Sequence, residues 1–199
     1  MKLIVLGMMK FKFLGVLFFL VTITTTAQVK YEREFRIKKS QFPAIAHQVL
    51  KNNLQGAKRL KFYKEIDSTN ISYEAKFKKS RLWYSIEFNK EGVLEDIEIT
   101  INEVDIPNET FDKIHHFLTT NFISYKIKKI QQQYVNNGDE AKVIKDAFQN
   151  LMLPYINYEI MCSGKKDKAY QDFEILFNSE GIFKSIRKSL PANYDHVLY

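Results

Sequence analysis

The chain has 199 residues, of which 30 are basic and 23 acidic, giving a formal net charge of +7, and it contains one cysteine. A chain of this length buries enough core to fold without disulfides, and a single cysteine excludes an intrachain disulfide framework. The positive charge is interspersed with acid, as in YEREFRIKK, which is typical of a solvated surface, so nucleic acid is not an expected partner.

Residues 1–27 have the order of a secretory signal peptide. Lysines at 2, 10 and 12 precede an apolar run over 13–23, and small residues end at Ala27. The run is too short for a transmembrane helix, which needs about 20 apolar residues. We therefore expect cleavage near Ala27 and no transmembrane segment afterwards. Without those three lysines, 27 basic residues face 23 acidic ones, and the net charge falls to +4.

The single cysteine helps to indicate the cellular compartment of the protein. An exported chain without disulfides fits a bacterial periplasm or cell surface better than a small disulfide-rich secreted scaffold. We therefore expect a periplasmic or extracellular bacterial protein. Cys162 itself is interpreted as a half-buried strand residue.

Residues 28–103 read as one helix followed by four antiparallel strands. The helical pattern follows Phe42-Pro43, and proline suits the first turn of a helix because its missing N–H would lack a partner there. Beyond it, apolar and polar residues alternate, as in half-buried strands. The expected strands are 60–66, 71–78, 82–88 and 93–101.

Residues 104–199 repeat this order with one insertion. A helical pattern follows Ile106-Pro107, and an inserted helix is expected near 139–151, with Asp139 as its N-cap and Pro154 beyond its end. The expected strands are 126–134, 156–161, 170–177 and 182–189.

The two halves share a hairpin sequence. Phe-Asn-x-Glu-Gly occurs at 88–92 and again at 177–181, each time between alternating segments. The glycine supplies a positive φ, and the asparagine side chain bonds its own backbone in the turn. Two such turns in matching strands indicate an internal duplication. The predicted fold is α+β, with two tandem helix-plus-four-strand repeats forming a curved antiparallel sheet.

Alternation in the first repeat assigns the two faces of this sheet. An apolar set is expected to pack under the helices, which then lie on one face, and a polar set is left open. The apolar set is Leu60, Phe62, Ile66, Tyr73, Ala75, Phe77, Tyr84, Ile86, Phe88, Ile97, Ile99 and Ile101. The polar set is Arg59, Lys61, Tyr63, Glu65, Glu74, Lys76, Trp83, Ser85, Glu87, Asp96 and Glu98.

These features together resemble the PepSY-like or beta-lactamase-inhibitor-like periplasmic proteins. The resemblance rests on a proline-led helix, a Tyr-containing strand and a Phe-Asn-x-x-Gly hairpin, duplicated behind a signal peptide. It implies a continuous curved sheet with one free face, and binding or inhibition in place of catalysis. The inserted helix and the missing disulfide cysteines depart from the family pattern, and the resemblance names no particular partner.

The sequence offers no catalytic or metal-binding motif. His115 and His116 are adjacent, so on a helix they point about 100° apart and cannot share a metal as an i, i+4 pair does. Glu91 and Glu180 occupy corresponding loops, but one acid per loop falls far short of a calcium shell. We predict no cofactor and no metal.

The open sheet face is therefore the candidate site. Trp83, the only tryptophan, is out of phase with its apolar neighbours and is expected to point to the polar side near Tyr63, where an exposed Trp among charges is typical of a protein-binding surface. We predict a non-enzymatic module that recognises or inhibits another envelope protein. The site residues are Tyr63, Glu74, Lys76, Trp83, Ser85 and Glu87.

Two alternatives stay open. One is a periplasmic carrier with an apolar ligand cavity between helices and sheet, suggested by 16 Phe and 11 Tyr residues. The other is an enzyme with an acid pair formed by Glu74 and Glu87. The sequence predicts no oligomeric state.

Overall fold

A computed structural model describes residues 29–30, 32–67 and 70–189. The expected signal peptide lies outside the described residues. The first half contains β1, β2, α1 and β3–β6, with short 3₁₀ turns η1 and η2. Their bounds are β1 Val29–Lys30, β2 Glu32–Ile37, η1 Lys39–Gln41, α1 Ala44–Lys51, β3 Lys58–Asp67, β4 Asn70–Lys79, β5 Leu82–Asn89, β6 Leu94–Ile101 and η2 Glu103–Asp105.

The second half contains two helices and four strands. They are α2 Asn108–Asn121, β7 Ser124–Val135, α3 Glu140–Phe148, β8 Asn157–Lys165, β9 Tyr170–Asn178 and β10 Phe183–Ser189. Each predicted helix and strand is present, with ends that differ by a few residues. Strands β1 and β2 were not predicted.

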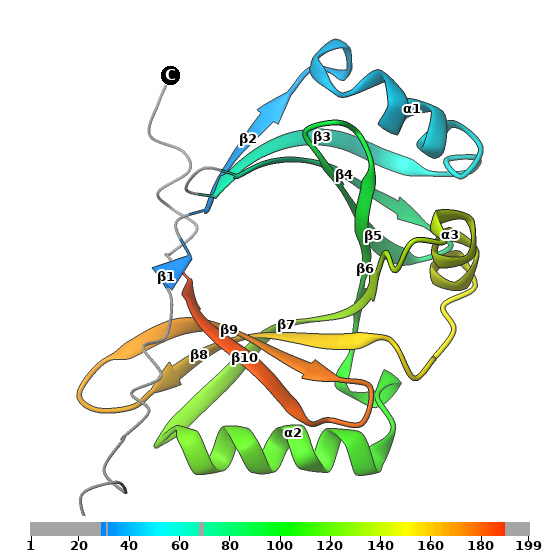
Figure 1. The fold of residues 1–199 in the computed structure, drawn as a ribbon. Coiled ribbons are helices and arrows are strands. Elements are labelled where there is room, and N and C mark those ends of the chain that lie inside the picture. Colours follow the sequence, from blue (N-terminus) through cyan, green and yellow to red (C-terminus); the bar gives the residue numbers. More distant parts are fainter. Residues whose placement is uncertain (1–28, 31, 68–69, 190–199) are drawn as a thin grey trace, which may run out of the picture.

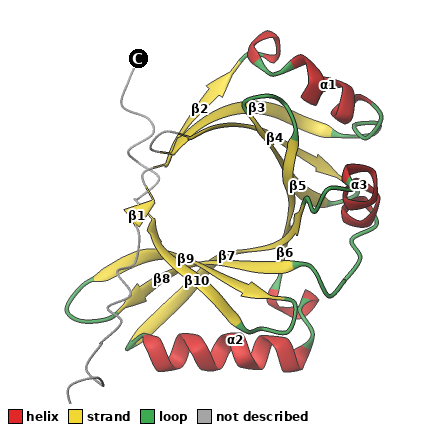
Figure 2. Ribbon diagram, viewed as in Figure 1, coloured by secondary structure: helices red, strands yellow, loops and turns green. Residues whose placement is uncertain are grey.

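One curved sheet organises the molecule. Strands β2 to β10 lie side by side in chain order, each antiparallel to the next, and β1 pairs with β10 in parallel. The sheet is open, and its edge strands β1 and β2 are neighbours in the chain. It curls strongly, and all three helices lie outside the curve (Figure 1, Figure 2). The predicted fold class, an α+β curved antiparallel sheet with helices on one face, is confirmed.

Helices α1 and α2 begin in the same way. Phe42 and Ile106 each follow a 3₁₀ turn and are buried, with 5% and 3% of their surface exposed. The next residue is proline, and the helix starts directly after it, as predicted. The two buried side chains fix each helix entry against the sheet.

The paired hairpin turns also match their prediction. Gly92 and Gly181 have φ values of 84° and 77°. The side chain of Asn89 accepts hydrogen bonds from the backbone N–H of Glu91 and Val93, both at 3.0 Å. Asn178 makes the same pair of bonds in the second half. Each turn packs on the first turn of the helix in its own half, because a Cβ on either glycine would meet that helix within 3.2 Å.

Helix α3 is shorter than expected but capped as expected. The Asp139 side chain accepts a hydrogen bond from the backbone N–H of Lys142 at 3.0 Å. The helix ends at Phe148, and Asn150 turns the chain with a φ of 50°. The Phe148 ring stacks on Tyr84 of β5 with 5.1 Å between centroids. The insertion thus covers the sheet between α1 and α2 (Figure 1).

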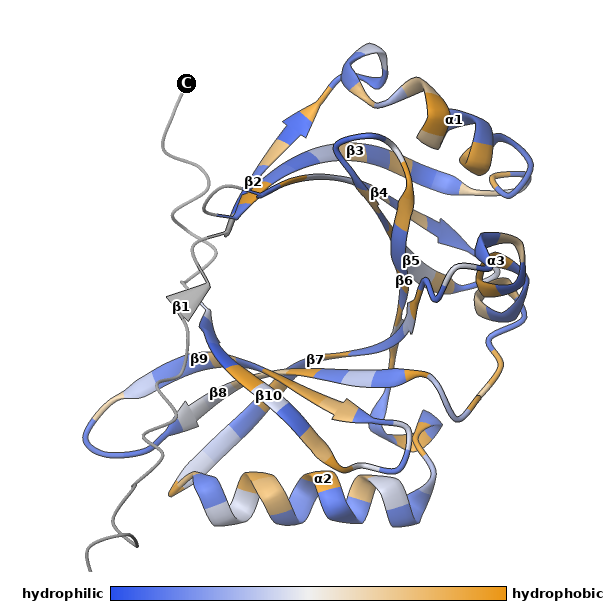
Figure 3. Cartoon of the chain, viewed as in Figure 1, coloured by the Kyte–Doolittle hydropathy of each residue, from blue (hydrophilic) through white to orange (hydrophobic). Residues whose placement is uncertain are grey.

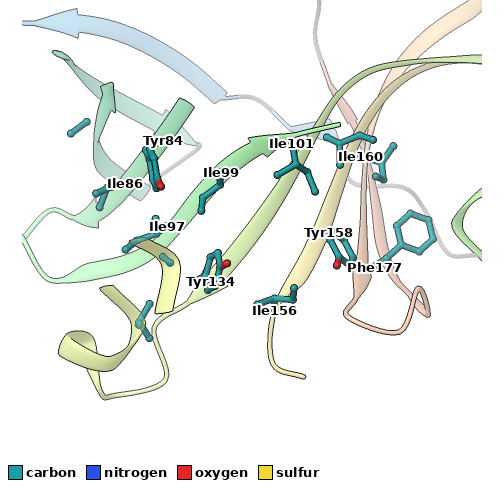
Figure 4. Close-up of a cluster of buried hydrophobic side chains, with 14 of the residues drawn as sticks. Tyr84, Ile86, Ile97, Ile99, Ile101, Tyr134, Ile156, Tyr158, Ile160 and Phe177 are labelled. Atoms are coloured by element: carbon teal, nitrogen blue, oxygen red, sulfur yellow. The ribbon is translucent and has the colours of Figure 1, made fainter. Parts of the chain in front are cut away.

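The core lies between the helices and the outer face of the sheet. Apolar and polar residues alternate along the strands (Figure 3), and the apolar set points outward toward the helices. Figure 4 shows part of this cluster. Its labelled members are Tyr84, Ile86, Ile97, Ile99, Ile101, Tyr134, Ile156, Tyr158, Ile160 and Phe177. The aromatic residues that suggested a ligand cavity contact one another here as core.

Among the described residues, no helix is both long and apolar enough to cross a membrane.

Candidate functional site

The inner face of the sheet is polar, as the alternation predicts. Directly opposite residues on neighbouring strands share a face, and the register pairs Tyr63 with Glu74, Glu74 with Glu87, and Ser85 with Glu98. The face is less open than expected, because the curl of the sheet buries its centre. Glu74 and Ser85 are only 3% and 6% exposed.

Three predicted site residues remain reachable near β2, at one edge of the sheet. Trp83 is 40% exposed, and Tyr63 and Lys76 are half-buried. They share a pocket of about 430 Å³, a volume within the usual range for ligand sites. The remaining lining residues are Arg36, Arg59, Leu60 and Lys61. Trp83 therefore points to the polar side and lies near Tyr63, as the sequence indicates.

A β-bulge shapes the pocket wall. Lys58 pairs with Lys78 and Lys61 with Lys76, so β3 carries one residue more than β4 between these pairs. Arg59, inside the bulge, has a left-handed backbone with φ of 60°. The extra residue changes the phase of alternation, and Leu60 lines the pocket with 37% of its surface exposed. The expectation that Leu60 packs under the helices is wrong for this reason.

Two cations contact the ring of Trp83. The guanidinium carbon of Arg59 and the Nζ atom of Lys78 are each 5.7 Å from the centroid of its ring. Such contacts place the positive charge over the negative face of the indole. They hold the ring at the mouth of the pocket while leaving part of it exposed.

Lys76 lines the pocket and pairs with two carboxylates. Its Nζ atom is 2.7 Å from Glu34 Oε2 and 2.8 Å from Glu74 Oε2, and it lies 4.9 Å from the ring centroid of Tyr63. The two carboxylates raise the pKa of Lys76 against the opposing effect of burial. This lysine therefore keeps its charge and holds Glu34 and Glu74 together.

Glu74, Ser85 and Glu87 do not line the pocket. The Ser85 hydroxyl donates a hydrogen bond to Glu74 Oε1. Burial and the neighbouring Glu65 raise the pKa of Glu74 to about 8, although Lys76 opposes the shift. Glu87 is half-buried opposite Glu74. Glu74 contacts the pocket residue Lys76 and is held by Ser85.

A second set of carboxylates occupies the middle of the inner face. Burial, together with the charges of Glu87 and Glu159, raises the pKa of Asp96 well above its usual range. Burial raises the pKa of Glu98 too, helped by Glu159 and Asp96. Asp96 Oδ2 also accepts a hydrogen bond from Gln133 at 2.8 Å. The sequence did not predict this cluster, because its members come from strands in both halves.

Two acidic trios have the spacing of metal ligands. Glu34, Glu65 and Glu74 form one, and Glu87, Asp96 and Glu98 form the other, with one oxygen from each residue within 4.8 Å of the others. Lys76 already pairs with Glu34 and Glu74 of the first trio. Three oxygens are half of the six or more that calcium takes.

The remaining reactive groups do not form a site in the described structure. Cys162 is fully buried, not half-buried, and burial raises the pKa of its thiol to about 11. His115 and His116 are exposed on α2. His47 contacts the carbonyl oxygen of Lys39 at 2.9 Å.

Sequence reasoning missed one strand of the site. Arg36 and Glu34 come from β2, which pairs with β3 so that Arg36 lies opposite Tyr63 and Glu34 opposite Glu65. The signal was present in the alternation of Glu32-Arg-Glu-Phe-Arg-Ile. The strand was not predicted because most of its residues are charged, as suits a strand that is exposed for much of its length.

The structure is thus a curved antiparallel sheet with helices on its outer face and a cationic, aromatic pocket near one edge. Comparison with known proteins supports the fold. No family model and no curated protein matches the sequence. Solved structures do match. A DUF2874 family protein from Bacteroides ovatus aligns with a TM-score of 0.51 and 10% identity, covering 74% of this chain and 87% of the other.

Two further structures also align. A "putative periplasmic" protein from Bacteroides eggerthii aligns with a TM-score of 0.52 and 13% identity over 74% of this chain and 88% of its own. A BLIP-like protein from Bacteroides fragilis aligns with a TM-score of 0.48 and 11% identity over 73% of this chain and 86% of its own. The structures from B. ovatus and B. eggerthii confirm, at the level of the fold, the resemblance to PepSY-like and beta-lactamase-inhibitor-like proteins.

Proposed function

We propose that this protein is an exported, non-enzymatic binding module that recognises another envelope protein at the pocket on the inner face of its sheet. The observation that carries the proposal is the only tryptophan of the chain, 40% exposed and flanked by cations. Trp and Arg are the residues that most often dominate binding energy at protein interfaces. Binding that covers a partner's own site would inhibit that partner.

The pocket narrows the predicted binding surface. Tyr63, Lys76 and Trp83 line it, whereas Glu74, Ser85 and Glu87 act as its support. Both oxygens of Glu74 are engaged, one by the Ser85 hydroxyl and one by Lys76. An acid pair of Glu74 and Glu87 therefore has little access to a substrate, which favours binding over catalysis.

The carrier alternative gains no comparable support. The rings that suggested an apolar cavity pack against one another, as Phe77 on Tyr84 at 5.4 Å and Phe122 on Phe173 at 5.0 Å. Close-packed aromatic side chains are typical of a core.

Capture from envelope extracts tests the proposed function. The wild type and the variants Trp83→Ala and Tyr63→Ala serve as bait, with Tyr170→Ala as the matched control because Tyr170 is 60% exposed on β9, outside the pocket. We expect a captured protein to be lost with the two pocket variants and kept with the control. Unchanged capture of every partner by Trp83→Ala would overturn the assignment of the surface.

Export is proposed from the first 27 residues and has its own test. The basic segment, apolar run and Ala27 predict cleavage beside Gln28. N-terminal sequencing of the protein from a bacterial periplasmic fraction should begin at Gln28 or Val29. Retention of the full-length chain in the cytoplasm would contradict export.

A further inference from the structure

Three of the four cations that line the pocket have no ion pair among the described residues. Lys76 is paired with Glu34 and Glu74. Within the described part of the chain, by contrast, no carboxylate forms an ion pair with Arg36, Arg59 or Lys61. These three cations come from β2 and β3 and line one pocket.

The same pocket offers apolar contact beside the charge. Leu60 and the exposed part of Trp83 line it together with the three cations. Arginine's planar guanidinium binds carboxylates through two parallel hydrogen bonds and stacks on aromatic rings. The surroundings therefore suit a group that combines a carboxylate with an apolar or aromatic side chain.

The bulge in β3 is a further sign that the pocket is functional. Arg59 adopts a left-handed backbone conformation, which is unfavourable for most residues other than glycine. Bulges of this kind often lie next to binding sites, where they redirect a side chain. Here the bulge places Arg59 over Trp83, at the mouth of the pocket.

Burial sets a limit on depth. Glu74 contacts Lys76 and is only 3% exposed, and Glu65 is also buried. An anionic group that moved from the pocket toward these residues would lose solvent and move away from the lining cations. The lining cations attract such a group, and the cost of desolvating it keeps it among them.

From these contacts we infer that the pocket binds an acidic segment of the partner protein. Its carboxylates contact Arg36, Arg59 and Lys61, and a neighbouring apolar side chain packs on Trp83 and Leu60. The inference rests on the proposed function and adds the chemistry of the partner. A pocket of about 430 Å³ accommodates a few side chains, which favours a short peptide segment over an extended polyanion.

Trp83 gives a direct readout, because it is the only tryptophan in the chain. The probe is an acetylated pentapeptide with a central phenylalanine and two acidic residues on each side. Its control replaces every Asp and Glu by Asn and Gln. We expect saturable quenching of Trp83 fluorescence by the acidic peptide, with at least tenfold weaker binding of the amide peptide. Added salt should weaken the acidic peptide's binding.

Charge-reversal variants distinguish binding in the pocket from a general effect of net charge. Arg59→Glu and Lys61→Glu should each weaken the acidic peptide at least tenfold. Lys168→Glu, in the turn between β8 and β9, makes the same change in net charge and should alter binding less than twofold. Circular dichroism melting curves confirm that each variant is folded, and each binding comparison uses the folded variants.

Several results would overturn the inference. Equal binding of the amide peptide would show an apolar site, and equal competition by inorganic phosphate or a single-stranded oligonucleotide would show a general anion site. Absence of quenching by the acidic peptide would also overturn it. If capture from envelope extracts still depends on Trp83 in any of these cases, the binding function stands and only the acidic ligand fails. If the peptide binds but Trp83→Ala captures the same envelope proteins as the wild type, the peptide site stands and the proposed function fails.

Discussion

Arg59 lies over the indole ring of Trp83, 5.7 Å from its centroid, on a backbone with φ of 60°. This conformation costs an L-residue other than glycine about 1 kcal/mol. We expect Arg59→Gly to be more stable than Arg59→Ala by about 1 kcal/mol, because both lose the cation–π contact and only glycine relieves the backbone. In a domain of this size the difference is a rise of about 3 °C in Tm, measured by circular dichroism. Equal melting of the two variants would contradict the left-handed backbone.

Stability should fall as pH rises from 5 to 8. Burial and Glu65 raise the folded-state pKa of Glu74 to about 8, above its ordinary value of 4.5. The folded state therefore binds more protons than the unfolded state in this window, and the stabilisation present at low pH is lost as pH rises through the folded pKa. One such proton gives a slope of at most about 1.4 kcal/mol per pH unit.

Urea unfolding at several pH values measures this slope. Glu74→Gln keeps an oxygen that can accept the Ser85 hydrogen bond but removes the titration, so it should flatten the curve. Glu180→Gln, an exposed acid in the β9–β10 turn, is the control and should leave the slope unchanged. A wild-type protein more stable at pH 8 than at pH 5 would contradict the raised carboxylate pKa values.

The two turn glycines at φ of 77° should respond differently to alanine. At Gly56 a Cβ meets nothing within 4 Å, so Gly56→Ala should cost only the left-handed backbone, about 1 kcal/mol. At Gly181 the Cβ would lie 2.5 Å from the carbonyl oxygen of Thr110 in α2. Gly181→Ala should therefore cost a further 1–3 kcal/mol, roughly the cost of overpacking. Denaturant midpoints measure both, and equal losses would argue against the contact between turn and helix.

Cys162 should resist modification in the native protein. Its thiol is buried on β8, and burial raises its pKa to about 11, so little thiolate forms at neutral pH. A chromogenic disulfide reagent such as DTNB should react to completion in concentrated urea but slowly in buffer. Rapid stoichiometric labelling of the folded protein would show that this part of β8 opens readily.

The sequence predicted strands and faces well because a period of two leaves a strong pattern in half-buried strands. Trp83 stood out because it breaks the apolar phase of β5, and this placed it correctly near Tyr63. The bulge at Arg59 left no such trace, since it lacks the glycine that usually marks a left-handed residue. The error at Leu60 follows from that single extra residue.

Curvature was the other feature that alternation could not supply. Alternation says which side chains share a face, but the bend of that face depends on bulges and register shifts between neighbouring strands, which alternation does not reveal. Glu74 and Ser85 were therefore placed on the correct side but expected at the surface. Arg36 was missed because only the pairing of β2 with β3 places it opposite Tyr63.

The short strands β1 and β2 give the fold a particular order of assembly. The partner of β2 follows it closely in the chain, whereas the partner of β1 is the last described strand. Pairing of segments so far apart in the chain is slow, because closing the long loop between them costs conformational entropy. As the chain is synthesised from its N-terminus, β2 can find β3 early, while Val29 and Lys30 must wait for Lys188 and Ser189. The outer edge of β10 is thus the last to be covered, and until then it is exposed to pairing with other chains.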